Sequence, residues 1–217
     1  MKKVIKIYIV LLCFTCSMTA QAQTIDKYLV DMPSYLMPAL SSSLRLELME
    51  YYKSEQRDSI KNLFGYKAKL LALDTINNYV SIQSTSGSRF EMKTFQLQDS
   101  SVVIGIINTV CAPVCSSYIQ FFDKNWKAAN LNFPKLSNEN WLLTPEKITD
   151  GTKVEKLMKT TFVELSFNPA NNSITARNNS IDLLSVEDQI TVRPFVKKEN
   201  ILFKFISDGS WKQITAI

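Results

Sequence analysis

The chain has 217 residues, 46% of them hydrophobic, with a formal net charge of +5 and no histidine. This length and apolar content suffice for one domain with a substantial core or for two small lobes. The absence of histidine excludes a Ser-His-Asp triad, a Cys-His pair and every histidine-containing zinc site, so an enzyme of this composition would use carboxylates, lysine or tyrosine, or a carboxylate-held metal.

The first 22 residues have the three parts of a secretory signal peptide. A basic start at Lys2 and Lys3 precedes an apolar run over residues 4–14, and Ala20-Gln21-Ala22 forms the A-x-A cleavage pattern. The apolar run is shorter than the roughly 20 residues needed to span a bilayer, which disfavours a membrane anchor. We therefore expect cleavage after Ala22, a periplasmic or secreted protein, and no membrane span in the mature chain.

Lipoprotein processing at Cys13 or Cys16 would be a third fate for this segment. It needs a small residue directly before the cysteine and an aliphatic residue three positions before it. Leu12 fails the first condition for Cys13, and Cys13 fails the second for Cys16. We therefore expect no lipid anchor at either cysteine.

Cleavage would also lower the net charge. Residues 1–22 contain three lysines and no acid, so their removal takes the charge from +5 to +2. Nucleic-acid binding needs a concentrated basic face, which this balance does not favour. The five glycines are scattered singly, so the sequence has no glycine-rich phosphate loop. The sequence thus predicts no nucleic-acid partner and no cofactor.

Residues 31–55 have a helical pattern in two pieces. Pro33 fits a first helical turn, and Pro38 limits this piece to a short one. Ser41-Ser42-Ser43 supplies a cap for a second helix through Tyr52. Apolar side chains recur along the second helix at helical spacing and predict a buried face: Leu44, Leu48, Met49 and Tyr52.

After Gly65 the apolar period changes from about 3.6 to 2, which is typical of strands. Short polar turns join the predicted strands, so we expect antiparallel neighbours in a meander. The predicted strands cover residues 66–73, 79–83, 90–97, 102–107 and 117–122.

Two of these strands have individual features. The segment 102–107 is the most continuously apolar part of the mature chain and is the candidate for the central strand. In the segment 90–97, Phe95 is out of phase with Phe90 and Met92. A bulge near Lys93-Thr94 would restore one buried face.

A polar, asparagine-rich connection over residues 127–140 leads to a second α+β set. Its expected elements are a short helix, a hairpin, a helix that Ser185-Val186-Glu187-Asp188 caps and Pro194 ends, and a last hairpin around Asp208-Gly209. The short helix is expected over 153–159, the first hairpin over 161–167 and 174–176, and the last over 201–206 and 211–214.

The sequence therefore predicts an α+β fold. An N-terminal helical segment packs on an antiparallel β-meander, and a smaller α+β lobe follows and ends in a β-hairpin. The expected organisation is a signal peptide over 1–22, a helix and sheet lobe over 23–130, and a C-terminal lobe over 131–217, separate from or continuous with the first. The residues expected to be buried together are Leu44, Leu48, Ile104, Ile106 and Phe122.

Four segments of the chain form a pattern that can be compared with known families. The segments are Met32-Pro33-Ser34-Tyr35-Leu36-Met37-Pro38, the Leu44-Arg45 helix, Asn108-Thr109-Val110-Cys111-Ala112-Pro113-Val114-Cys115, and Phe122-Asp123-Lys124-Asn125-Trp126-Lys127. Together they resemble a family of secreted proteins of unknown function from gut Bacteroidetes. The resemblance implies an envelope location and an α+β fold, and it implies no activity.

Cys111 and Cys115 are the two cysteines left after cleavage, and they bracket the tip between two predicted strands. In an exported chain such a pair usually forms a disulfide, and a three-residue loop allows the two Cα atoms to come within bridging distance. A redox pair is the alternative, but C-x-x-x-C is not the C-x-x-C spacing. A metal site is weaker still, since zinc requires four ligands.

The carboxylates form no recognisable catalytic set. Glu47 with Glu50, and Glu187 with Asp188, fit solvated positions on helices. We predict no catalytic, metal-binding or cofactor-binding residue. Glycosidase carboxylates can come from two distant positions, so a carboxylate-dependent periplasmic hydrolase stays the alternative function. Two carboxylates facing each other in a deep cleft would favour it.

Asp58-Ser59-Ile60 and Asp74-Thr75-Ile76 resemble the Asp-Ser/Thr-aliphatic sites at which Bacteroidetes O-glycosylate exported proteins. Ordinary turn residues also explain both patterns. Glycosylation would require both sites to be exposed.

The sequence thus predicts an exported, non-catalytic cell-envelope protein that binds a partner, either another envelope protein or a glycan. Loops held by a rigid sheet commonly carry function. We therefore expect the contact region on the loop side around Pro113, Trp126 and the connection over 127–140.

Overall fold

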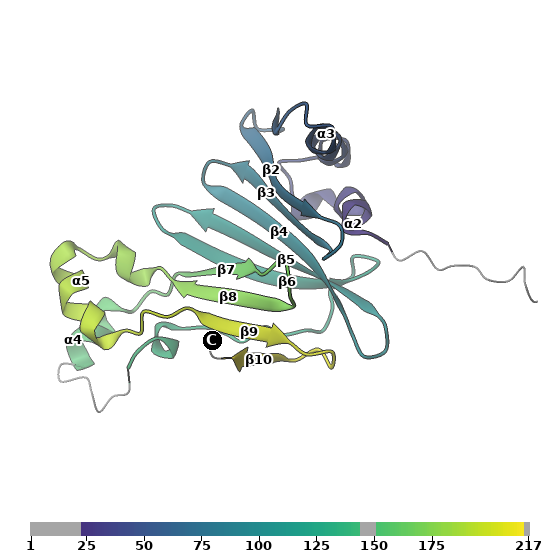
Figure 1. Cartoon of the computed structure of the whole chain (residues 1–217). Helices are drawn as coiled ribbons and strands as arrows, with labels where there is room; N and C mark the ends of the chain where they lie inside the picture. Colours follow the sequence, from purple (N-terminus) through teal and green to yellow (C-terminus); the bar gives the residue numbers. More distant parts are fainter. Residues whose placement is uncertain (1–22, 144–150, 215–217) are drawn as a thin grey trace, which may run out of the picture.

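The computed structural model of the chain describes residues 23–143 and 151–214. The predicted signal peptide lies outside the described residues. Two antiparallel sheets and four α-helices make up this part of the chain (Figure 1). The α-helices are α2 (Ile25–Asp31), α3 (Ser42–Lys53), α4 (Gly151–Leu157) and α5 (Val186–Val192). The strands are β1 (Ser59–Lys61), β2 (Lys67–Asp74), β3 (Tyr79–Thr85), β4 (Ser88–Gln96), β5 (Val102–Cys111), β6 (Cys115–Asp123), β7 (Val163–Phe167), β8 (Ser173–Asn178), β9 (Ile201–Phe205) and β10 (Trp211–Ile214).

The larger sheet is a meander of six strands in the order β1-β2-β3-β4-β5-β6, and every neighbouring pair is antiparallel. The predicted α+β fold with an antiparallel meander is confirmed. The short edge strand β1 is an addition that the sequence pattern did not reveal, because three residues are too few to establish a period.

The N-terminal helices differ in part from the prediction. The first helix, α2, precedes Pro33, and only a single 3-10 turn, η1 (Ser34–Leu36), lies between Pro33 and Pro38. The residue before a proline is disfavoured in the helical region. Met32 accordingly has ψ 132° and ends α2, so the predicted helical piece after Asp31 is wrong.

The second helix, α3, is confirmed. The side chain of Ser41 accepts a hydrogen bond from the backbone N–H of Leu44 at 3.3 Å, as a cap requires. Arg45 of α3 is buried and donates from Nη2 to the carbonyl oxygens of Val30, at 3.1 Å, and of Met32. These carbonyls lie at the end of α2, so Arg45 holds the two helices together.

Helices α2 and α3 cover one face of the larger sheet (Figure 1). Their apolar side chains form the first core with those of β1 to β6. Leu48, Ile104, Ile106 and Phe122 are buried there and Leu44 packs against them half-buried, so the predicted common core is confirmed.

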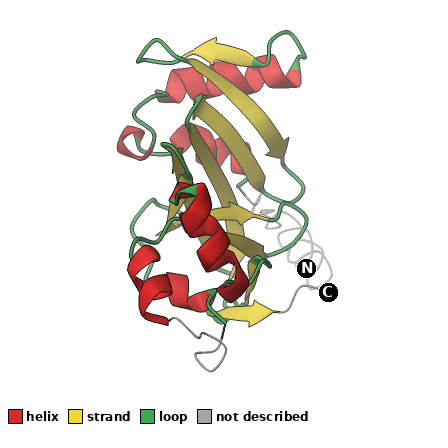
Figure 2. Cartoon of the chain, turned by 90° about the vertical axis from the view of Figure 1, so that its left-hand side faces the viewer, coloured by secondary structure: helices red, strands yellow, loops and turns green. Residues whose placement is uncertain are grey.

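The smaller sheet, in the order β10-β9-β8-β7, covers the opposite face of the larger one, and α4 and α5 lie at one end of it (Figures 1 and 2). The second core lies between the sheets and draws side chains from both sides of residue 130. Phe95 is at its centre, with ring centroids 4.8 Å from Phe205, 5.5 Å from Trp211 and 5.7 Å from Phe167.

Burial of both faces of the larger sheet explains why the apolar residues of β4 and β5 do not follow a simple alternation. The predicted bulge near residues 93–94 is wrong, because β4 pairs with β5 without a register shift. Phe90 and Met92 point into the first core while Phe95 points into the second. Likewise β5 is the fifth of six strands, not the middle one. Its continuous apolar run reflects two covered faces and not a central position.

Within residues 23–143 and 151–214, no helix combines the length and the apolarity that crossing a membrane would require.

Candidate functional site

A row of polar side chains lies on the face of β4 that meets the smaller sheet. Arg89, Glu91 and Lys93 alternate along the strand, and Glu91 is only 4% exposed. The hydroxyl of Tyr79 donates to Oε1 of Glu91 at 3.1 Å, and the backbone N–H of Phe167 donates to Oε2 at 3.1 Å. Both oxygens of this carboxylate are therefore bonded within the fold.

A second carboxylate, that of Glu164 on β7, joins the row through Arg89. Nη2 of Arg89 donates to Oε1 of Glu164 at 2.9 Å, and Nε lies 3.5 Å from Oε1 of Glu91. The other oxygen of Glu164 accepts from Nδ2 of the buried Asn179 at 3.3 Å. One guanidinium thus bridges two carboxylates, and all four carboxylate oxygens have a partner.

Burial shifts the protonation equilibria of this row. It raises the pKa of Glu91 above the usual glutamate value, and the charge of Arg89 opposes part of that shift. Burial also raises the pKa of the Tyr79 hydroxyl, and the charge of Glu91 adds to the effect. Burial lowers the pKa of Lys93, whose Nζ donates to the carbonyl oxygens of Asn77 at 2.9 Å and Pro169 at 3.0 Å.

The geometry of the row favours a structural role over a catalytic one. An open hollow of about 420 Å³ lies over Arg89, Glu91 and Glu164. A general acid or base must reach the substrate with its own oxygen, and the oxygens of Glu91 are turned to Tyr79 and Phe167. The two carboxylates flank an arginine and do not face each other across a deep cleft.

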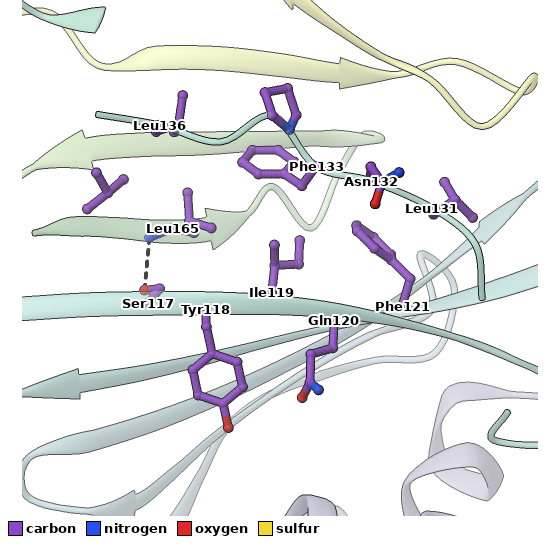
Figure 3. Close-up of a pocket in the computed structure, with 12 residues that line it drawn as sticks. Ser117, Tyr118, Ile119, Gln120, Phe121, Leu131, Asn132, Phe133, Leu136 and Leu165 are labelled. Atoms are coloured by element: carbon purple, nitrogen blue, oxygen red, sulfur yellow. Dashed lines mark hydrogen bonds between the residues drawn. The ribbon is translucent and has the colours of Figure 1, made fainter. Parts of the chain in front are cut away.

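A groove of about 350 Å³ lies between β6, β7 and the connection between the two sheets (Figure 3). The side chains of Ile119 and Phe121 point from β6 toward Phe133 and Leu165, whereas Tyr118 and Gln120 point away (Figure 3). The apolar side chains that line the groove are Ile119, Phe121, Leu131, Phe133, Pro134, Leu136, Val163 and Leu165.

The backbone of β6 along this groove has an open edge. Ala112 N–H donates to the Val114 carbonyl, and Ala129 N–H donates to the Phe121 carbonyl at 2.9 Å. In an antiparallel sheet, successive residues of a strand direct their backbone N–H and C=O alternately toward one side of the strand and toward the other. The first bond shows that the even-numbered residues of β6 face β5, and the second shows that the odd-numbered residues face away from it. Across the described ranges, no hydrogen bond engages the backbone of Ile119 on that side.

The edge is bounded at one end by β7. The backbone N–H of Leu165 donates to Oγ of Ser117 at 2.9 Å (Figure 3), so the strands touch through a side chain and not through a ladder. At the other end, an antiparallel bridge between Phe122 and Ala128 pairs the edge of β6 with the residues that follow the strand. The open stretch between them is centred on Ile119.

The residues expected in the contact region are only partly brought together. Residues 131–134 and Leu136 of the connection line the groove, but Pro113 and Trp126 do not. Pro113 is exposed at the tip of the β5–β6 hairpin, and Trp126 packs on Phe122 with ring centroids 5.8 Å apart. At that hairpin the sulfur atoms of Cys111 and Cys115 lie 1.98 Å apart, at disulfide distance.

The two Asp-Ser/Thr-aliphatic segments differ in exposure. Thr75 is exposed in the turn between β2 and β3, where Asp74 accepts from the backbone N–H of Ile76 at 3.1 Å. Ser59 is half-buried in β1, and Ile60 is buried in the first core. Only Thr75 has the exposure that glycosylation requires.

Sequence reasoning did not find Glu91, Glu164 or the groove. The alternation of Arg89, Glu91 and Lys93 with apolar residues was the available signal for the polar row. Phe95 lies on the same face of β4 as these three charged residues. A large apolar residue on that face indicates that a second layer covers it, so the charged side chains lie between the two sheets. The described residues contain no group of three or more Cys, Asp or Glu side chains placed to hold a metal ion.

A family model described as "Protein of unknown function (DUF3256)" matches residues 17–210. The chain belongs to the DUF3256 family. This DUF3256 protein is also similar to a solved structure titled "Structure of a domain of an uncharacterized protein from Porphyromonas gingivalis W83", with a TM-score of 0.76 and 18% sequence identity. The similarity covers 88% of this chain and 98% of that one and shows a shared fold. No curated protein matches the chain.

Proposed function

We propose that this DUF3256 protein is an exported, non-catalytic protein of the cell envelope that binds an extended segment of a partner protein along the open edge of β6. The observation that carries the proposal is the unpaired backbone at Ile119 beside an apolar groove. An added strand would supply N–H and C=O groups to this edge, and its alternate side chains would enter the groove.

The chemistry of the edge supports a polypeptide partner over a glycan. Backbone donors and acceptors that alternate at strand spacing are complementary to another extended backbone. The groove floor offers apolar side chains such as Phe133 and Leu165, which match apolar side chains better than sugar hydroxyls.

Two further observations support export and the absence of catalysis. The cysteine pair at disulfide distance fits an oxidising compartment outside the cytoplasm. The best-placed carboxylates, Glu91 and Glu164, are bonded on both oxygens by groups of the fold. The signal peptide pattern in residues 1–22 agrees with export.

A randomised library of peptides about ten residues long, long enough to form a strand, tests the proposal. We expect selected peptides to have apolar residues at alternate positions. These peptides should bind the Ile119→Pro variant at least tenfold more weakly than the unaltered protein. Proline at this position removes the backbone N–H that faces the groove and removes no hydrogen bond between β6 and β5. Ile119→Val is the matched control and should bind normally.

Peptides that bind Ile119→Pro as well as the unaltered protein would refute the edge as the binding site. Turnover of glycans, esters or peptides that Glu164→Gln abolishes would instead support the hydrolase alternative.

A further inference from the structure

The turn between β1 and β2 carries three large apolar side chains in water. Leu63 is 62% exposed, Phe64 is 63% exposed and Tyr66 is 60% exposed. Tight turns normally carry small polar residues. An apolar group presented at a turn tip therefore marks a contact surface rather than ordinary surface composition.

The fold holds this turn in one conformation. Asn62 is buried, and its Oδ1 accepts from the backbone N–H groups of Phe64 and Tyr66, both at 3.0 Å. Its Nδ2 donates to the carbonyl of Ser84 at 2.7 Å. Because these hydrogen bonds fix the backbone of the turn, Leu63, Phe64 and Tyr66 are held in fixed positions at its tip.

Two lysines flank the turn, one at the end of β1 and one at the start of β2. Lys61 and Lys67 are exposed and directly opposite each other across the β1–β2 ladder. Cε of Lys61 lies 3.7 Å from the position that a Cβ on Gly65 would occupy, so its ammonium group is beside the turn. Residues 59–73 contain three lysines and no acid. Of these, Lys69 is paired with Asp58 at 2.8 Å.

We propose that the tip at residues 63–66 docks this protein peripherally on an anionic phospholipid surface. Leu63 and Phe64 would enter the boundary between headgroups and acyl chains, and Tyr66 would lie at headgroup level, where aromatic side chains are favoured. Lys61 and Lys67 would contact the lipid phosphates, since lysines next to an apolar anchor are attracted by anionic headgroups.

This surface is separate from the β6 groove. The tip lies at the β1 edge of the larger sheet, and the groove lies at the β6 edge. Peptide binding and vesicle binding can therefore be measured and lost independently.

Vesicle sedimentation with the protein purified from the cells that produce it provides the test. The vesicles are phosphatidylcholine alone or phosphatidylcholine with about 30% phosphatidylglycerol, which supplies the negative surface potential. We expect binding to the anionic vesicles that weakens when salt rises from about 0.05 to about 0.5 M.

The double variant Leu63→Ser/Phe64→Ser should reduce this binding at least tenfold. The matched control Ile76→Ser/Val186→Ser removes two other exposed apolar side chains and should bind normally. Lys61→Gln/Lys67→Gln should retain weak binding that no longer depends on salt.

Equal binding of the tip variant and the unaltered protein would overturn the proposal, and so would equal binding to neutral and anionic vesicles. Self-association that the tip variant loses, without any vesicle binding, would assign the tip to a protein contact and would also overturn it.

Discussion

Oε2 of Glu91 on β4 accepts the backbone N–H of Phe167 on β7 at 3.1 Å, so a carboxylate of the larger sheet directly bonds the edge of the smaller one. Together with the contact between Arg89 and Glu164, this bond connects the two sheets through polar groups beside an apolar core of aliphatic and aromatic side chains. The ionisation of Glu91 is therefore coupled to the stability of the whole chain.

The first prediction concerns pH. The raised pKa of Glu91 means that the folded state binds more protons than the unfolded state above the ordinary glutamate value. This contribution to stability is complete below that value and is lost as pH rises through the raised pKa. We therefore expect the free energy of unfolding of the unaltered protein, relative to Glu91→Gln, to fall over that window.

Urea unfolding from about pH 4 to about pH 8, a range that spans ordinary and raised glutamate pKa values, measures this difference. Asp26, whose pKa is lowered, contributes equally to both proteins and cancels. Glu199→Gln, at an exposed position, should run parallel to the unaltered protein. A parallel profile for Glu91→Gln would contradict the prediction.

A second prediction concerns the tight contact at Gly105 on β5. A Cβ at this position would lie 3.0 Å from ring carbons of both Phe167 and Phe95. Overpacking by Gly105→Ala should cost about 1–3 kcal/mol of stability. Phe167→Leu should cost less in the Gly105→Ala background than alone, since it opens the space. Additive losses in the double-mutant cycle would show that the ring is not the obstacle.

The third prediction tests the first core. Ile104 is fully buried, so Ile104→Ala should lower the free energy of unfolding by about 2–5 kcal/mol through the cavity it leaves. Val110, on the same strand, is 55% exposed, and Val110→Ala should change stability by no more than about 0.5 kcal/mol. Denaturant unfolding of both variants checks the contrast, and similar losses would argue against it.

The cysteine pair supplies a fourth prediction. In protein purified without reductant from the cells that produce it, thiol labelling under denaturing conditions should detect no free thiol at Cys111 or Cys115 before reduction. The loop between Cys111 and Cys115 is short, so the double serine variant should still fold and lose less than about 3 kcal/mol. Free thiols at these two positions would rule the bridge out.

Local signals made much of this fold predictable. The cap at Ser41, the change of period after Gly65 and the hairpin turn at Gly209 each act over a few residues. Gly209 has a φ of +93°, which is the conformation its turn requires. The antiparallel order of the meander followed from the short turns, because they leave no room for crossovers.

The candidate sites depend on contacts that no local pattern records. Arg89 and Glu164 are 75 residues apart in sequence, and either residue alone has the pattern of a solvated strand position. The groove depends on where the aperiodic residues 131–136 settle against β6. The wrong prediction of a bulge near residues 93–94 has the same origin. Phe95 lies on the opposite face of β4 from Phe90 and Met92, and this arrangement is expected only when a second sheet covers that face.

The two-sided burial of β4 also protects its own pairing. A slip of one residue against β5 would exchange the two faces of the strand, moving Arg89, Glu91 and Lys93 into the core under the helices and Phe90 and Met92 toward the polar partners of the smaller sheet. Such a slip would bury charges without partners on one side and leave the carbonyl oxygens that accept from Lys93 without a donor on the other. The strand can therefore occupy only one alignment, and mispaired intermediates at this position should be too unstable to accumulate during folding.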